Sequence, residues 1–252
     1  MSSERQYRGQ IVQFGRMLHE RGYVAATDGN LSVRLSDDRI LATPTGMSKR
    51  MLRLADLAAV NMEGRQLTGR RTASSELGMH LLIYRLRPDV KAIVHAHPPT
   101  ATGFAAAGLA LNQPLVCEVV IGLGSIPLAG YGTPGTPELA ESLEPLISQY
   151  DAILMSNHGV VTYGDTLDDA YMKMETVEHF AQIALVTHLL GRQHPLGEPE
   201  LQKLNLVRSK YQAARSAATL PGHADGGNHH GTNHSRSSQK PLKARSTESR
   251  QR

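Results

Sequence analysis

The stretch that most constrains the fold is a short apolar run that ends in two histidines and two prolines. Residues 90–99 read V-K-A-I-V-H-A-H-P-P. The run predicts a buried β-strand, and Pro98 and Pro99 end it because proline cannot donate to the strand ladder. Side chains two apart in a strand share a face, so His95 and His97 should point together, about 6 to 7 Å apart along the chain. This spacing allows both imidazoles to bind one metal ion; alternatively, one histidine is a buried structural residue and the other lies on the surface.

A third histidine follows another predicted strand in the same way. Residues 151–159 read D-A-I-L-M-S-N-H-G, so the apolar strand Ala152–Met155 leads to His158. Glu76 lies at the start of a predicted helix, where a carboxylate also suits the helix dipole. Three histidines with one exchangeable position suit Zn²⁺, so these strand ends predict a metal site. The remaining histidines of the predicted domain are interpreted as structural or surface residues: His19, His80, His179, His188 and His194.

Helical and strand patterns alternate along the chain. Apolar spacing and capping residues predict helices over residues 5–20, 74–86, 100–107, 136–147, 166–190 and 198–215. Short apolar or alternating runs predict strands over residues 31–35, 39–42, 58–62, 115–120, 124–128 and 152–155, besides the strand that ends at His95. Because hairpin-like strand pairs lie between the helices, the pattern indicates helices packed on a mixed or antiparallel sheet.

The basic charge of the chain is confined to its C-terminal end. The net charge is +4, and residues 217–252 hold six of the 27 Lys and Arg residues but only two of the 23 Asp and Glu residues. Residues 1–216, the predicted folded domain, are therefore neutral, which argues against nucleic acid as a partner. Residues 217–252 are rich in Gly, Ser and His and poor in large apolar residues, which predicts a disordered basic tail.

Membrane and secretory features are not expected. No apolar run approaches the roughly 20 residues of a spanning helix, and the N-terminus M-S-S-E-R-Q-Y-R does not resemble a secretory signal. The single cysteine, Cys117, excludes an internal disulfide. These features predict a cytoplasmic protein without membrane partners.

Two predicted strands adjoin loops of small hydroxyl and amide residues with glycine. Thr27-Asp28-Gly29-Asn30 opens onto the strand 31–35, and T-P-T-G at residues 43–46 follows the strand 39–42. Such loops can present N–H groups and side-chain donors to an anion. They can equally be plain turns.

Together these motifs resemble the class II aldolase/adducin family. G-N-L-S-V-R, T-P-T-G, S-S-E, H-A-H and N-H-G occur in the order in which the family has them, from the first helix to about residue 190. Each motif is weak alone, whereas five in the same order are specific. The resemblance implies a three-layer α/β/α fold with a central, mainly antiparallel or mixed sheet.

The resemblance also implies the roles of individual residues. His95, His97 and His158 would bind the divalent metal, Zn²⁺ in most members, with Mn²⁺ or Co²⁺ as alternatives. Glu76 would approach the metal in the free enzyme and act as the general base once substrate displaces it. A small sugar phosphate would be held through its phosphate by a set of loop residues: Asn30, Thr45, Gly46, Ser74 and Ser75, with Thr27 and Gly29 shaping the pocket.

The implied reaction is metal-dependent cleavage of a ketose 1-phosphate to dihydroxyacetone phosphate and an aldehyde. L-Fuculose 1-phosphate, 5-deoxyribulose 1-phosphate and 5-methylthioribulose 1-phosphate are the candidate substrates. One alternative is a dehydratase of methylthioribulose 1-phosphate. The other is a non-catalytic, adducin-like structural module, against which the intact set of metal ligands argues. The family further implies a homotetramer with sites at subunit interfaces.

One position departs from the family pattern. In the aldolase branch that the chain most resembles, a tyrosine on the strand after the His-x-His region acts as the acid at the C4 oxygen in a neighbouring subunit's site. The equivalent position here, within P-L-V-C-E-V-V, is Glu118. A carboxylate could serve as the acid with a different pKa, as a glutamate does in the dehydratase, or Glu118 could be an ordinary exposed residue.

Overall fold

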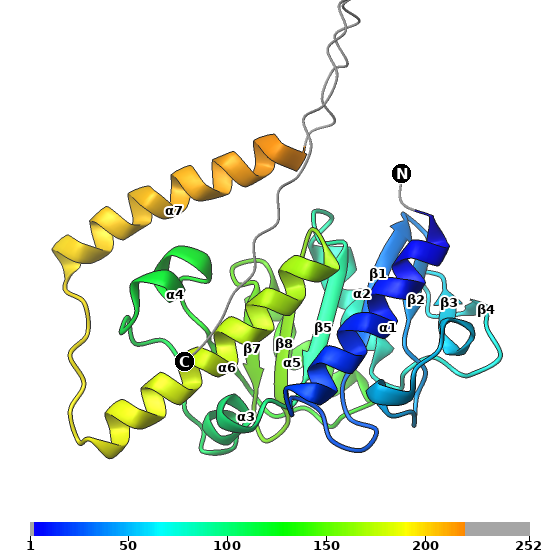
Figure 1. Cartoon of the computed structure of the whole chain (residues 1–252), viewed down its shortest axis with the longest axis horizontal. Helices are drawn as coiled ribbons and strands as arrows, with labels where there is room; N and C mark the ends of the chain where they lie inside the picture. The colour runs from blue at the N-terminus through cyan, green and yellow to red at the C-terminus, as the bar shows by residue number, and fades with distance from the viewer. Residues whose placement is uncertain (1–2, 220–252) are drawn as a thin grey trace, which may run out of the picture.

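A single eight-stranded sheet organises the computed structural model, which describes residues 3–219 (Figure 1). The strand order is β4-β3-β2-β1-β5-β8-β7-β6, and every neighbouring pair is antiparallel except β6 and β7. The strands are β1 (Asn30–Ser36), β2 (Arg39–Ala42), β3 (Ala58–Val60), β4 (Gln66–Thr68), β5 (Ala92–Ala96), β6 (Leu128–Ala129), β7 (Ala152–Met155) and β8 (Gly159–Gly164).

Helices cover both faces of this sheet, which confirms the predicted three-layer α/β/α architecture. Helices α1, α3 and α6 lie on one face, and α2 and α5 lie on the other (Figure 1). The helices are α1 (Glu4–Glu20), α2 (Leu77–Leu86), α3 (Pro99–Ala106), α4 (Cys117–Gly122), α5 (Pro137–Ile147), α6 (Leu167–Leu189) and α7 (Glu198–Thr219). Two short 3₁₀ turns span Lys49–Met51 and Leu54–Asp56.

The alternation of side chains in β5 divides its residues between the two cores. Val94 packs with α1, α3 and α6, whereas Ile93 packs with α2 and α5. His95 lies two residues after Ile93 and therefore points toward the α2 side of the sheet. The central strand thus delivers its first histidine to the face on which α2 begins.

The segment around Glu118 differs from the sequence prediction, which was a strand. Residues 115–120 are not a strand; helix α4 spans Cys117–Gly122. Val119 and Leu123 lie four residues apart and are both buried, so a helical turn is what brings them into the core together. The β-branched residues favoured a strand, but tertiary packing overrides that propensity. Residues 124–128 are likewise mostly loop, with only Leu128 in β6.

Two smaller differences concern the ends of the fold. Strand β4 was not predicted from the sequence. It is an edge strand whose three residues are all exposed, so it lacks apolar alternation. Helix α7 extends to Thr219, so it includes the first residues of the predicted tail, and residues 220–252 of that tail lie outside the described residues. Within the part of the chain that the structure describes, no helix is both long and apolar enough to cross a membrane.

Candidate active site

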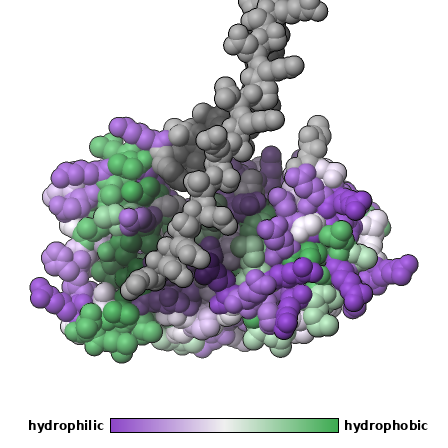
Figure 2. Space-filling view, in the orientation of Figure 1, coloured by the Kyte–Doolittle hydropathy of each residue, from purple (hydrophilic) through white to green (hydrophobic). Residues whose placement is uncertain are grey.

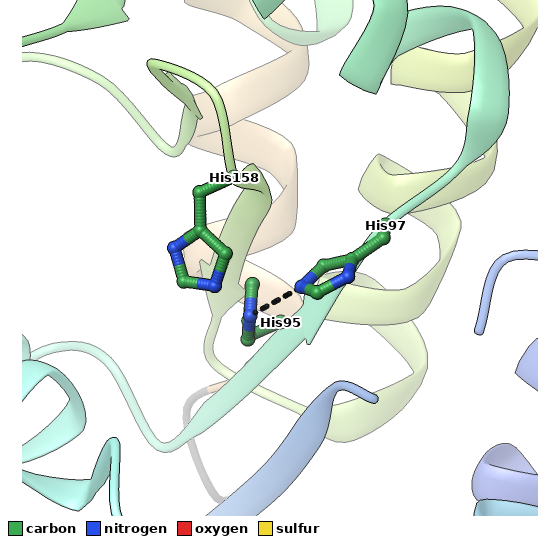
Figure 3. Close-up of side chains that lie close together, drawn as sticks. All are labelled: His95, His97 and His158. Atoms are coloured by element: carbon green, nitrogen blue, oxygen red, sulfur yellow. Dashed lines mark hydrogen bonds between the residues drawn. The ribbon is translucent and has the colours of Figure 1, made fainter. Parts of the chain in front are cut away.

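The three predicted histidines converge at one end of the central strands. His95 is fully buried in β5, where it lies between Asn30 of β1 and Val161 of β8. His97 follows the end of β5, and His158 lies in the turn between β7 and β8. Figure 3 shows the three rings pointing toward one another. One ligand nitrogen from each ring lies within 4.8 Å of the others.

Glu76 closes this group from the α2 side. Its Oε1 lies 3.0 Å from Nε2 of His158, and its Oε2 lies 3.3 Å from Nε2 of His95. Glu76 occupies the N-cap position of α2 rather than the first turn, and its side chain makes no capping hydrogen bond. The carboxylate therefore faces the histidines instead of the helix N–H groups.

The hydrogen bonds of His95 indicate what the cluster can hold. Its Nδ1 lies 2.9 Å from the carbonyl oxygen of Val160, an acceptor, so Nδ1 carries the proton. In the neutral ring, the lone pair of Nε2 then faces Oε2 of Glu76, which can only accept. The same nitrogen lies 3.1 Å from Nε2 of His97 (Figure 3). A proton or a metal cation between these atoms would remove the conflict. The donor set thus fits a divalent metal with three nitrogen ligands and a nearby carboxylate.

The electrostatics of the site favour this interpretation. Burial, together with neighbouring His95 and His158, lowers the pKa of His97 to about 3, so its imidazole is neutral at neutral pH, the form that can bind a metal. Burial opposes ionisation of Glu76, but its contacts with His158 and His95 outweigh burial and hold the pKa of this carboxyl well below its usual range. The site therefore combines neutral imidazole nitrogen with an ionised carboxylate.

The loops predicted to hold a phosphate lie beside this cluster and are joined to one another. The 43–46 loop pairs with the segment before α2, because Ser74 N donates to Thr43 O at 3.1 Å and Thr45 N donates to Thr72 O at 3.0 Å. Asn30 Nδ2 donates to Oε2 of Glu76 at 2.6 Å. Of the predicted residues, Thr27, Thr45, Gly46 and Ser75 are exposed, Gly29 and Ser74 are half-buried, and Asn30 is buried.

Gly29 requires the absence of a side chain. Its φ of +71° is in the left-handed region, and a Cβ there would lie 2.7 Å from the carbonyl oxygen of His95. The turn that leads into β1 can therefore approach the metal-ligand strand only with glycine at this position.

Two charged residues near the site, Asp28 and Lys49, were not predicted from the sequence. Asp28 Oδ2 lies 3.6 Å from Nδ1 of His97. Lys49 is 1% exposed, and its Nζ donates to the carbonyl oxygens of Thr27 at 2.8 Å and Met47 at 2.6 Å. Burial lowers the pKa of Lys49 to about 8, against the opposing effect of Asp28 and Glu76. The position of Lys49 three residues after the T-P-T-G loop was the only local signal that it lies near the site.

Glu118 is not part of this cluster within one chain. It is exposed in the first turn of α4, and no hydrogen bond or ion pair among the described residues joins it to the histidines or to Glu76.

Comparison with known proteins agrees with this geometry. The Class II Aldolase and Adducin N-terminal domain family matches residues 9–185. A 3-oxo-tetronate 4-phosphate decarboxylase of Pectobacterium atrosepticum is 37% identical over 190 residues, which make up 74% of this chain and 87% of that protein. A 5-deoxy-D-ribulose 1-phosphate aldolase of Bacillus thuringiensis is 32% identical over 199 residues, covering 78% of this chain and 92% of the relative.

A solved structure supports the same assignment. The structure of an L-fuculose 1-phosphate aldolase superposes with a TM-score of 0.77 at 28% identity, covering 84% of this chain and 98% of the other. These relatives are enzymes, so the alternative of a non-catalytic module is not supported. The chain is thus an enzyme, and it belongs to the class II aldolase and adducin family.

Proposed function

We propose that this protein is a metal-dependent lyase that cleaves a ketose 1-phosphate to dihydroxyacetone phosphate and an aldehyde. The candidate substrates are L-fuculose 1-phosphate, 5-deoxyribulose 1-phosphate and 5-methylthioribulose 1-phosphate. The observation that carries the proposal is the contact of Glu76 with two of three convergent histidines, at 3.0 Å from His158 and 3.3 Å from His95. An ionisable carboxylate next to a metal site is what proton transfer beside a polarised carbonyl requires.

His95, His97 and His158 would hold the metal, which we propose to be Zn²⁺, with Mn²⁺ or Co²⁺ as alternatives. When bound, such an ion supplies Lewis-acid polarisation of the substrate carbonyl. The hydrogen bond from His95 Nδ1 to Val160 O orients the ring and leaves Nε2 free as a ligand.

The substrate phosphate would bind at the polar loops beside this site. Asn30, Thr45, Gly46, Ser74 and Ser75 would bind it, with Thr27 and Gly29 shaping the pocket. Two observations support this role: the 43–46 and 72–74 segments are hydrogen-bonded to each other, and buried Lys49 bonds to Thr27 O and Met47 O. Exposed hydroxyls and a nearby cation suit a phosphate dianion.

Glu76 would handle the proton at the carbon next to the ketone. In the cleavage direction it takes up a proton from solvent and delivers it to the carbon released when the C3–C4 bond breaks. In the reverse direction it removes a proton from that carbon. Its ionised state in the free protein matches the second role, and contact with the histidines explains how that state is maintained in a mostly buried position.

A second candidate is decarboxylation of a phosphorylated 3-oxo acid. The observation in its favour is the 37% identity to a 3-oxo-tetronate 4-phosphate decarboxylase. Loss of CO₂ from that substrate leaves an electron pair on the carbon next to the ketone. This carbon takes up one proton and gives dihydroxyacetone phosphate. Glu76 therefore performs the same proton transfer in both reactions, and both yield the same phosphorylated product. They differ in whether the other fragment is an aldehyde or CO₂.

Cleavage of a ketose also needs a group that removes the proton from the C4 hydroxyl. We propose that Glu118 from a neighbouring subunit of a homotetramer performs this step. Two observations are consistent with an interface there. Glu118 is exposed on α4, which packs against α7. Apolar side chains are exposed where α6 ends and within α7, visible as the green area at the left of Figure 2: Leu185, Val186, Leu189, Leu190, Leu206 and Val207.

The decisive experiment incubates metal-loaded protein with the three ketose 1-phosphates and with 3-oxo-tetronate 4-phosphate. Dihydroxyacetone phosphate is assayed together with aldehyde and CO₂. Aldehyde release from a ketose supports the aldolase, and CO₂ release supports the decarboxylase. A diketone product from the methylthio sugar, without dihydroxyacetone phosphate, would instead identify the dehydratase.

Two variants serve as controls in the same assay. Glu76→Gln should slow either cleavage by about 10²- to 10³-fold while the protein stays folded. Glu118→Gln should slow ketose cleavage by about 10-fold or more, as for loss of an acid–base group, and leave decarboxylation unaffected. Unchanged ketose turnover in Glu118→Gln would remove Glu118 from the mechanism.

A further inference from the structure

A buried chain of hydrogen-bonded side chains leads from the core to Glu76. The hydroxyl of Tyr84 lies 2.9 Å from Ser32 Oγ, which lies 2.7 Å from Nδ1 of His80. Nε2 of His80 lies 2.5 Å from Oδ1 of Asn30, whose Nδ2 donates to Oε2 of Glu76 at 2.6 Å. Apart from Glu76, every side chain of this series is at most 4% exposed.

The chain depends on the register between one strand and one helix. Asn30 and Ser32 lie two residues apart in β1 and share a face of the sheet. Glu76, His80 and Tyr84 are spaced four residues apart along α2, so they share one face of the helix. His80 thus lies between the two polar residues of the strand and joins them.

The directions of the hydrogen bonds at Asn30 follow from their partners. The carboxylate of Glu76 only accepts, so the amide nitrogen of Asn30 must face it. The amide oxygen of Asn30 therefore faces His80 and can only accept from Nε2–H. In the neutral ring, Nδ1 then accepts from the hydroxyl of Ser32. Each group has one role, and a reversed Asn30 amide would place its oxygen against the carboxylate.

We propose that His80 is a positioning residue, which locks the Asn30 amide in the one orientation that donates to Glu76. Through Asn30, His80 holds the carboxylate in line with the histidine cluster. The inference rests on the proposed function, because Glu76 must be the group that moves the proton. His80 itself lies beneath Asn30 and does not reach the substrate.

The test compares two replacements of His80 with a matched control. His80→Leu removes both hydrogen bonds, whereas His80→Gln retains an N–H near the position of Nε2 and an oxygen that can accept from Ser32. Tyr163→Phe removes a buried hydroxyl that bonds to Ile147 O and Tyr150 O, away from Asn30. We expect kcat to fall about 10- to 100-fold in His80→Leu, as for a displaced catalytic group, and to stay within about 3-fold in His80→Gln.

A purely structural role predicts a different result. In that case His80→Leu, His80→Gln and Tyr163→Phe would lower activity only in step with their loss of thermal stability. Equal kcat values in the two His80 variants, at equal folded fractions, would overturn the proposal.

A second measurement does not depend on turnover. In the wild-type protein, NMR should show the side-chain amide protons of Asn30 protected from solvent exchange. We expect protection to be lost in His80→Leu and retained in His80→Gln. Protection that survives in His80→Leu would refute the positioning role. If no substrate is cleaved by the wild type, the proposed function fails, while the NMR result still decides whether His80 holds Asn30.

Discussion

The two ends of strands β5 and β8 carry buried polar clusters of opposite character. At the end where Ala92 pairs with Gly164, the Nζ of Lys173 lies 2.9 Å from each of three acceptors, which are Oδ2 of Asp151, Oδ2 of Asp169 and the carbonyl oxygen of Tyr163. At the other end, three imidazoles and Glu76 face one another, and the lone pair of His95 Nε2 is directed at a carboxylate oxygen of Glu76. The first cluster is satisfied by its own groups, whereas the second could hold a cation between its facing acceptors.

Hydrogen bonding therefore separates a structural cluster from a candidate functional one within the same sheet. A buried lysine whose three protons are all bonded to protein acceptors has nothing left to offer a ligand. A group of lone pairs directed at a common point is costly unless something occupies that point. The two clusters are similar in burial and in charge. They differ in whether each hydrogen-bond donor and acceptor has a partner.

Loss of a metal ligand should give the largest effect. We expect His97→Ala to lose bound metal and to lower kcat by about 10⁴-fold, because Lewis-acid stabilisation is worth several kcal/mol. Metal analysis and steady-state kinetics measure both effects, and chelation of the wild type should reproduce them. A variant that keeps its metal would show that the histidine end is not the metal site.

Glu76→Gln should lower kcat by about 10²- to 10³-fold, within the range for an acid–base group. The amide keeps the size of the carboxylate but cannot take up the proton. Circular dichroism and metal content should match the wild type, which separates this variant from His97→Ala. Full activity in Glu76→Gln would exclude it as the proton-transfer group.

Lys173→Met should change stability rather than chemistry. Removing this cation leaves the buried carboxylate of Asp169 without Lys173, while half-buried Asp151 keeps its ion pair with Arg87. The loss should lower the free energy of unfolding by about 3 kcal/mol. Urea denaturation measures this change, and kcat per folded molecule should stay at the wild-type value. A lower kcat at full folding would contradict the separation between the two ends.

Lys49 should produce the smallest effect, which depends on pH. Its pKa is about 8 in the folded protein and 10.5 in the unfolded chain, so between these values the unfolded chain binds more protons. The free energy of unfolding contributed by this residue should therefore rise with pH across that window, by at most about 1.4 kcal/mol per pH unit, and stay constant below it. In Lys49→Met, urea denaturation across the same window should lack this rise. An identical pH dependence in both proteins would show that burial does not depress this pKa.

Much of the fold was predictable because its signals are local. The strand that ends at His95, the helix before Gly22 and the helices that begin after Thr136 and Thr166 were all recognisable from spacing and end residues. Only Thr166 makes the expected side-chain cap; Thr136 does not. Helix α4 was wrongly predicted because Val119 and Val120 favour strands locally, while their burial against other helices decides the outcome. Strand β4 was missed because an exposed edge leaves no apolar pattern.

The sequence alone was enough to identify the candidate metal ligands and the strands at whose ends they lie. His95, His97 and His158 are marked by the ends of apolar runs, a property of neighbouring residues only. The tertiary structure decided their partners: Glu76 against two imidazoles, Asn30 against Glu76, and His80 beneath Asn30. These contacts join positions about 20 to 80 residues apart, and only the packing of α2 on the sheet brings them within hydrogen-bond distance.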